Sequence, residues 1–168
     1  MGLLRMTSLD QKSLLSQLAG MPAFLEATLG GVSAVDAQVD GPDGLFSPVD
    51  QCWHLADLER DGYAVRITRL LSEVDPLLPG FDGARIAKER RYKTLSLIAG
   101  IQAFRNARLA NLAALRAVPS SAWSRSGRQE GVGVVALCDV PAIMAGHDAS
   151  HRGEIDAWVR MRRGQAGT

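Results

Sequence analysis

The chain has 168 residues, which is enough for one domain with a substantial hydrophobic core. Its formal net charge of +1 argues against partners such as nucleic acid or an anionic membrane surface, which attract strongly basic proteins. Aromatic residues make up only 5% of a composition rich in alanine and leucine, and this favours helices over sheets.

Nothing in the sequence predicts export or a membrane anchor. The first ten residues contain no apolar run long enough for a secretory signal, and no stretch approaches the roughly 20 apolar residues that span a bilayer. Two cysteines, Cys52 and Cys138, do not make a disulfide framework in a chain of this length. We therefore expect a soluble cytoplasmic protein with reduced thiols.

Apolar residues recur with helical periodicity in four segments, and no segment shows sustained strand alternation. The first segment runs from about Ser8 to Leu29, and Pro22 predicts a kink or two consecutive helices there. The second begins after Ser47, a favourable N-cap followed by proline, and ends before Pro76.

The third helical segment runs from about Thr94 to Val118, and the fourth from about Val134 to Arg163. Pro141 lies inside the fourth segment and makes its N-terminal part the weakest part of the pattern. The glycine-rich stretch 127–133 lacks the Lys-Ser/Thr pair of a phosphate-binding loop.

A long connection separates the second and third predicted helices. The stretch 75–92 could reach on the order of 55 Å when extended, whereas the second helix is only about 40 Å long. The connection can therefore run the length of a bundle and allow two successive helices to lie parallel. We expect an all-α protein, in which residues 1–168 form a single four-helix bundle domain.

The placement of the three histidines is the most informative feature of the sequence. His147 and His151 lie four residues apart on a predicted helix, so both imidazoles can reach one ion. His54, near the middle of the second helix, would complete a three-histidine site with an open position. Such a pair also arises by chance, and a lone histidine is more often a hydrogen-bonded core residue. Asp148 directly after His147 argues against the H-E-x-x-H motif of zinc proteases.

Three carboxylates are predicted to lie near these histidines. Asp57 and Asp61 follow His54 by three and seven residues, and Glu154 follows His151 by three. Each could orient an imidazole or act as a general base on a metal-bound water. Each could equally be a solvated or salt-bridged helix carboxylate. We favour Asp57 and Glu154 as the candidate catalytic residues.

Three stretches of the chain resemble the DinB/YfiT-like superfamily of small metalloenzymes. They are S-P-V-D-Q-C-W-H-L-A-D-L-E (47–59), L-P-G-F-D (78–82) and I-M-A-G-H-D-A-S-H-R-G-E-I (143–155), and the segment 104–115 looks like the third helix of that family. The resemblance implies an often dimeric four-helix bundle with a long crossover between helices 2 and 3. It also implies a divalent ion held by the histidines matching His54, His147 and His151. Glu154 stands where relatives often carry glutamine, which would change the hydrogen bonds around the ligands.

Three nitrogen ligands suit zinc, nickel, copper or iron without selecting among them. A divalent ion with an open coordination position lowers the pKa of bound water toward 7 or holds a thiol as thiolate. The resemblance implies a small-molecule substrate, because some relatives use low-molecular-weight thiols and others are suspected hydrolases. We therefore expect a thiol-dependent S-transferase or isomerase, or else a hydrolase, acting as a homodimer. The alternative is a non-catalytic, stress-related metal-binding protein whose fourth coordination position is filled by protein.

Overall fold

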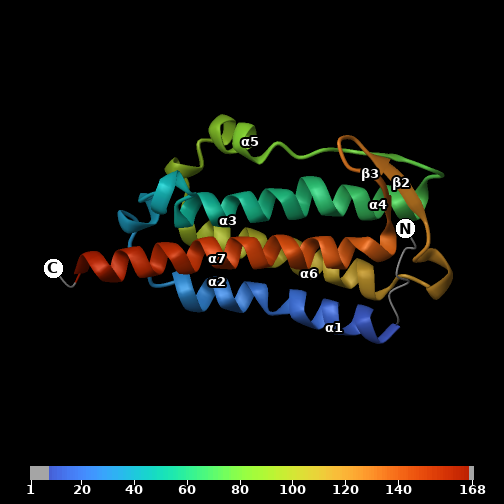
Figure 1. Ribbon diagram of the computed structural model, residues 1–168, viewed down its shortest axis with the longest axis horizontal. Helices are drawn as coiled ribbons and strands as arrows, with labels where there is room; N and C mark the ends of the chain where they lie inside the picture. The colour runs from blue at the N-terminus through green and yellow to red at the C-terminus, as the bar shows by residue number, and fades with distance from the viewer. Residues whose placement is uncertain (1–7, 167–168) are drawn as a thin grey trace.

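Figure 1 shows the computed structural model of the protein, which describes residues 8–166. Within these residues, four long helical elements, called rods below, make up the bundle. The first rod consists of two consecutive helices, α1 (Ser8–Ala19) and α2 (Met21–Leu29). Pro22 lies in the first turn of α2, where its missing N–H costs no helical hydrogen bond. The prediction of two helices meeting near this proline is confirmed.

The second rod contains α3 (Pro48–Asp57), a π-helical turn (Leu58–Tyr63) and α4 (Ala64–Ser72). At its start the Ser47 hydroxyl accepts the Asp50 N–H at 3.4 Å, and the Asp50 carboxylate accepts the Ser47 N–H at 3.3 Å. This reciprocal capping box agrees with the predicted helix start. The π-helical turn was not predicted, because it depends on packing and leaves no periodic signal of its own.

The third and fourth rods are α6 (Leu97–Arg116) and α7 (Val140–Ala166). The predicted start of the fourth helix at residue 134 is wrong, since the chain is extended before residue 137. The Asp139 carboxylate accepts the Ala136 N–H at 2.9 Å, and Pro141 then occupies the first turn of α7. A proline fits that position, whereas in a helix interior it would remove a hydrogen bond.

A small sheet, which no alternating pattern in the sequence indicated, closes one end of the bundle. Strand β1 (Leu77–Leu78) pairs in parallel with β2 (Ser126–Gln129), which forms an antiparallel hairpin with β3 (Gly133–Ala136). The glycine-rich stretch supplies the turn, where Gly131 and Gly133 have φ angles of 74° and 104°. Strands this short are too brief to show an alternating pattern.

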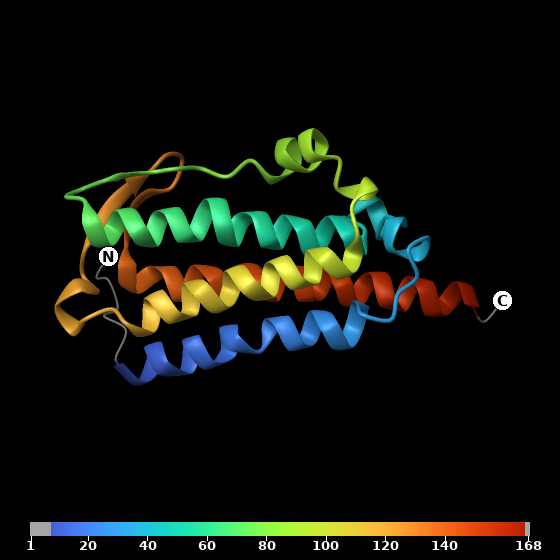
Figure 2. The same ribbon diagram turned by 180° about the vertical axis from the view of Figure 1, so that it is seen from behind.

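The connection between α4 and α6 returns along the whole bundle, and Figures 1 and 2 show it running over α3 and α4. It carries β1 and the short helix α5 (Gly83–Arg90), where the Asp82 side chain caps α5 by accepting the Arg85 N–H at 3.0 Å. As a result α3–α4 and α6 run in the same direction. The predicted four-helix bundle with a long crossover between helices 2 and 3 is confirmed.

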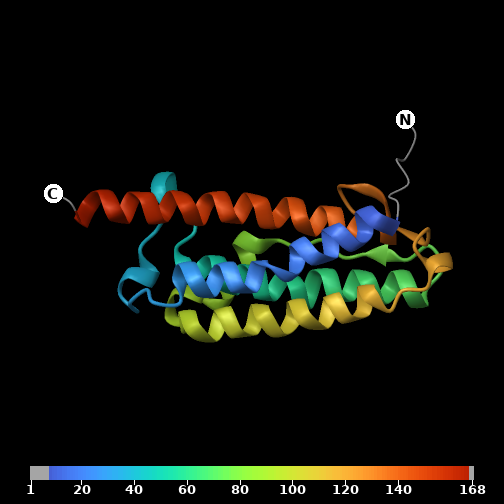
Figure 3. The same ribbon diagram turned by 90° about the horizontal axis from the view of Figure 1, so that it is seen from below.

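Two apolar clusters fill the bundle, and a polar layer lies between them. Along α6 the layer contains Arg108, flanked by Phe104 of one cluster and Leu112 of the other. Along α7 it contains the histidine pair, which lies between Met144 and Ile155. Figure 3 shows α1 and α2 lying between α6 and α7 and covering the bundle from below. Within residues 8–166, no helix has both the length and the apolar character that crossing a membrane requires.

Candidate metal centre

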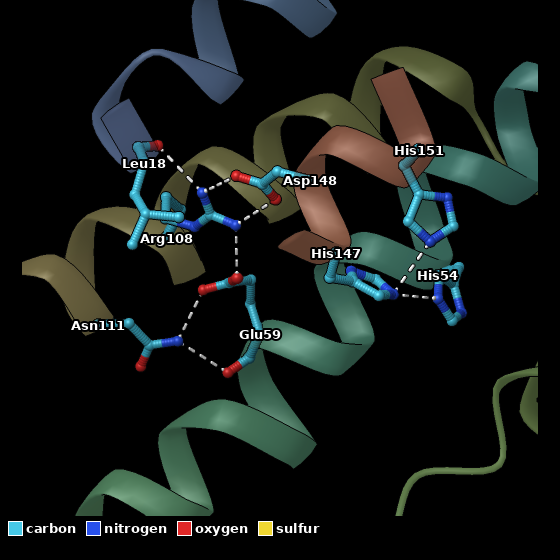
Figure 4. Close-up of polar contacts among 8 residues, drawn as sticks. All are labelled: Leu18, His54, Glu59, Arg108, Asn111, His147, Asp148 and His151. Carbon is cyan, nitrogen blue, oxygen red and sulfur yellow. Dashed lines mark hydrogen bonds and ion pairs between the residues drawn. The ribbon is translucent and has the colours of Figure 1, made fainter. Parts of the chain in front are cut away.

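The three histidines selected from the sequence meet in the polar layer (Figure 4). His147 Nε2 lies 3.4 Å from Nε2 of His54 and 3.0 Å from Nε2 of His151. Ligand atoms of all three residues lie within 4.8 Å of one another. Two nitrogen ligands on tetrahedral zinc, each about 2.0 Å from the metal, lie roughly 3.3 Å apart. The spacing of the imidazoles therefore suits one shared ion.

The electrostatic surroundings keep these imidazoles neutral. Burial lowers the pKa of each ring to about 4, and a neighbouring imidazole adds to the shift in every case. His54 and His151 are only 9% and 7% exposed. At neutral pH each ring therefore carries one unprotonated nitrogen, which is the form that binds metals.

Packing against the crossover and against Phe46, which precedes α3, holds His54. The rings of Phe46 and Phe81 contact the imidazole at centroid distances of 5.5 and 5.7 Å. A Cβ atom at Gly83 would lie 2.4 Å from His54 Cε1 and 2.6 Å from Nδ1, so only glycine permits this approach. The buried Nδ1 atom of His54 has no hydrogen-bond partner. Gly83 was not predicted as a site residue, although it directly follows the L-P-G-F-D stretch.

A second residue that sequence analysis missed is Gln51, which is 1% exposed. Its Oε1 atom lies 2.5 Å from His151 Nδ1, and its Nε2 atom donates to Glu154 Oε2 at 2.6 Å. The same Glu154 oxygen lies 3.4 Å from His151 Nδ1. Gln51 lies three residues before His54 on the same helix face, and this spacing was the available signal.

The two other carboxylates pair with groups other than the histidines. Asp57 is fully buried, but its oxygens accept hydrogen bonds from the Tyr92 hydroxyl at 2.5 Å and from Arg90. Asp57 thus anchors the crossover, and its charge offsets only part of the lowering of the His54 pKa that burial and His147 cause. Asp61 is half-exposed and pairs with Arg60 at 2.6 Å.

A buried network of charges adjoins the histidines (Figure 4). The Arg108 guanidinium, 1% exposed, donates to both oxygens of Asp148 at 2.7 and 2.8 Å and to Glu59 at 2.8 Å. Asn111 donates to the other carboxylate oxygen of Glu59 at 2.8 Å. Because Asp148 follows His147 directly, the network fixes the rotation of α7 that points His147 toward the other two rings. Neither Arg108 nor Asn111 was predicted as a site residue, although both interrupt the apolar face of the third helix.

Comparisons with known proteins agree with this fold. YfiT from Bacillus subtilis, described as a probable metal-dependent hydrolase with an unusual four-helix bundle topology, is 18% identical and has a TM-score of 0.87. The match covers 98% of this chain and 93% of that one. A mycothiol-dependent maleylpyruvate isomerase is 14% identical with a TM-score of 0.71, over 90% of this chain and 64% of that one.

A search of curated proteins found no match to this chain. The family model described as the DinB superfamily matches residues 17–155, a range that includes all three histidines. Because the match covers most of its length, the chain belongs to the DinB superfamily.

Proposed function

We propose that this protein is a divalent-metal-dependent enzyme acting on a small molecule, with His54, His147 and His151 as the metal ligands. The observation that carries the proposal is the convergence of three buried, neutral imidazoles through their Nε2 atoms. The three Nε2 atoms lie close together, at the spacing expected of ligands that share one ion. A zinc, nickel or iron ion would satisfy them together.

The number of ligands favours an enzyme over a non-catalytic metal-binding protein. Within residues 8–166, no fourth histidine, cysteine or carboxylate joins the cluster. Structural zinc sites use four protein ligands, whereas catalytic sites use three and leave a position for water or substrate. A divalent ion held here would supply Lewis-acid activation of a water or a thiol.

The surrounding residues would bind substrate and limit access of water. Phe46, Phe81 and Tyr63 contact the histidines and make the walls of the site apolar. Glu154 contacts the Nδ1 side of His151, away from the other two imidazoles. It is therefore placed to orient a ligand, and less well placed to take a proton from a group bound at the open position.

Of the two candidate reactions, hydrolysis and thiol-dependent transfer or isomerisation, we propose hydrolysis as the better supported. Its support is the fold likeness to YfiT, described as a probable metal-dependent hydrolase, over nearly the full length of both chains. Thiol-dependent transfer or isomerisation is the second candidate, supported by the fold likeness to the mycothiol-dependent isomerase. Both would use the same open coordination position.

The test is the metal content of the purified, reconstituted protein, followed by a screen of ester, amide and thiol-transfer substrates. We expect about one divalent ion per chain, and loss of that ion in a variant carrying His54→Ala, His147→Ala and His151→Ala. Cys138→Ser, which removes a partly exposed thiol, should leave the metal content unchanged. Equal metal content in the wild type and the triple variant would overturn the proposal.

A further inference from the structure

We infer that Gln51, held in orientation by Glu154, is a positioning residue that selects the tautomer of His151 whose Nε2 is free to bind metal. The inference rests on the proposed metal site and adds to it two residues that do not touch the ion. Gln51 lies on α3, while Glu154 and His151 lie on α7, so the contact also joins the two helices that carry the ligands.

The geometry links three side chains in a row. The Gln51 amide spans the gap between His151 Nδ1, at 2.5 Å from its oxygen, and Glu154 Oε2, at 2.6 Å from its nitrogen. Gln51 is 1% exposed and His151 is 7% exposed, so water does not compete for the contact between these two side chains. The direct approach of Glu154 Oε2 to His151 Nδ1 is longer, at 3.4 Å, which leaves the amide as the closer partner of the ring.

The chemistry of the three groups permits one arrangement of hydrogens. A carboxylate only accepts hydrogen bonds, so the end of the Gln51 amide that faces Glu154 must be its NH₂ group. The amide oxygen then faces His151, and since this oxygen also only accepts, His151 Nδ1 must carry the hydrogen. A neutral imidazole protonated at Nδ1 has its lone pair on Nε2, which is the atom directed at His147.

The other buried ligand lacks such a partner, and this contrast makes the inference specific. His54 Nδ1 has no hydrogen-bond partner, so packing against Gly83 and Phe81 holds the ring without selecting its tautomer. Removing the Gln51 amide should therefore change the protonation pattern of His151 directly, whereas it touches His54 only through His147.

The first measurement is long-range ¹H–¹⁵N NMR of the histidine rings in metal-free protein, which reports which ring nitrogen carries the proton. We expect His151 protonated at Nδ1 in the wild type and a mixture of tautomers in Gln51→Leu. This readout does not require bound metal, so it tests the inference even if the proposed metal site fails. A wild-type His151 protonated at Nε2 would overturn the inference.

The second measurement is zinc affinity by competition with a chelator. Gln51→Leu should weaken binding about 10- to 100-fold, the range typical for residues that orient metal ligands. Gln51→Glu alone places two carboxylates in contact and should also weaken binding. Combining it with Glu154→Gln exchanges the carboxylate and the amide, restores both hydrogen bonds and should recover most of the affinity. Gln102→Leu, on the exposed face of α6, is the matched control and should bind as wild type does.

The outcomes separate the inference from the proposed function. If the wild type binds no zinc, the proposed metal site is refuted, and the NMR measurement alone decides whether Gln51 sets the tautomer of His151. If the wild type binds zinc and Gln51→Leu binds it equally well, the metal site stands and the role of Gln51 is refuted.

Discussion

Replacing Arg108 with methionine should destabilise this protein more than any change at its surface. Methionine fills much of the same volume but removes the cation from a site that is 1% exposed. The substitution breaks two hydrogen bonds to Asp148, one to Glu59 and one to the Leu18 carbonyl. Both carboxylates then remain buried without their cation.

The size of the destabilisation depends on the carboxylates that stay buried without a partner. The energies of the individual hydrogen bonds cannot simply be added. Each hydrogen bond to a charged group contributes about 1.5–3 kcal/mol when measured alone. Breaking a buried ion pair by removing one partner costs about 3–5 kcal/mol, since the remaining charge stays desolvated. Asn111 still donates to Glu59 in the variant and limits the loss at that carboxylate. We therefore expect a loss of about 3–5 kcal/mol in the free energy of unfolding.

The loss should also depend on pH in a defined direction. Burial raises the pKa of Glu59, and the charge of Arg108 opposes that rise. Without Arg108 the pKa of Glu59 rises further, so the native state holds a proton that the unfolded state releases. Stability of the variant should therefore fall as pH rises above the unfolded pKa, and the deficit should be larger at about pH 8 than at about pH 5.

The assay is urea denaturation of metal-free protein followed by circular dichroism. Arg105→Met is the matched control, because Arg105 and its partner Glu26 are 57% and 66% exposed and lie 3.6 Å apart. This control should change stability by less than about 0.5 kcal/mol. If Arg108→Met lowers the free energy of unfolding no more than Arg105→Met does, the buried charge network does not stabilise the native state.

Four further predictions concern the metal centre and the helices around it. Gly83→Ala forces a methyl group against the His54 ring and should weaken zinc affinity at least about tenfold. By contrast, Gly146→Ala, which meets no atom within 4 Å, should raise stability by about 0.5–1 kcal/mol in a denaturation experiment. Asp57→Asn should speed amide hydrogen exchange in the crossover near Tyr92 while changing zinc affinity little; a large loss of affinity would instead place Asp57 among the orienting residues. Burial lowers the pKa of each ligand histidine from 6.5 to about 4, so the unfolded chain takes up protons at a higher pH than the native state does. The stability of metal-free protein should therefore fall as the pH is lowered from 6.5 to about 4. A denaturation midpoint that does not change over this pH range would contradict the prediction.

Much of the fold could be predicted from the sequence because the signals are local. Ser47 and the proline after it begin α3, and Pro22 separates α1 from α2. The spacing of His147 and His151 placed two imidazoles on one helix face. Such signals act within a turn or two of helix, so they need no knowledge of which helices meet.

Other features depended on the tertiary structure, because they arise where distant segments touch. The hairpin formed by β2 and β3 was predicted in part as the start of the fourth helix, and its pairing with the distant strand β1 appears only in the tertiary structure. The approach of Gly83 to His54 requires the crossover to lie against α3. The contacts of Gln51 with Glu154 and of Arg108 with Glu59 each join helices that are far apart in the chain. A buried polar residue on an apolar helix face indicates that it has a hydrogen-bond partner, but only the packing of the bundle decides which residue that partner is.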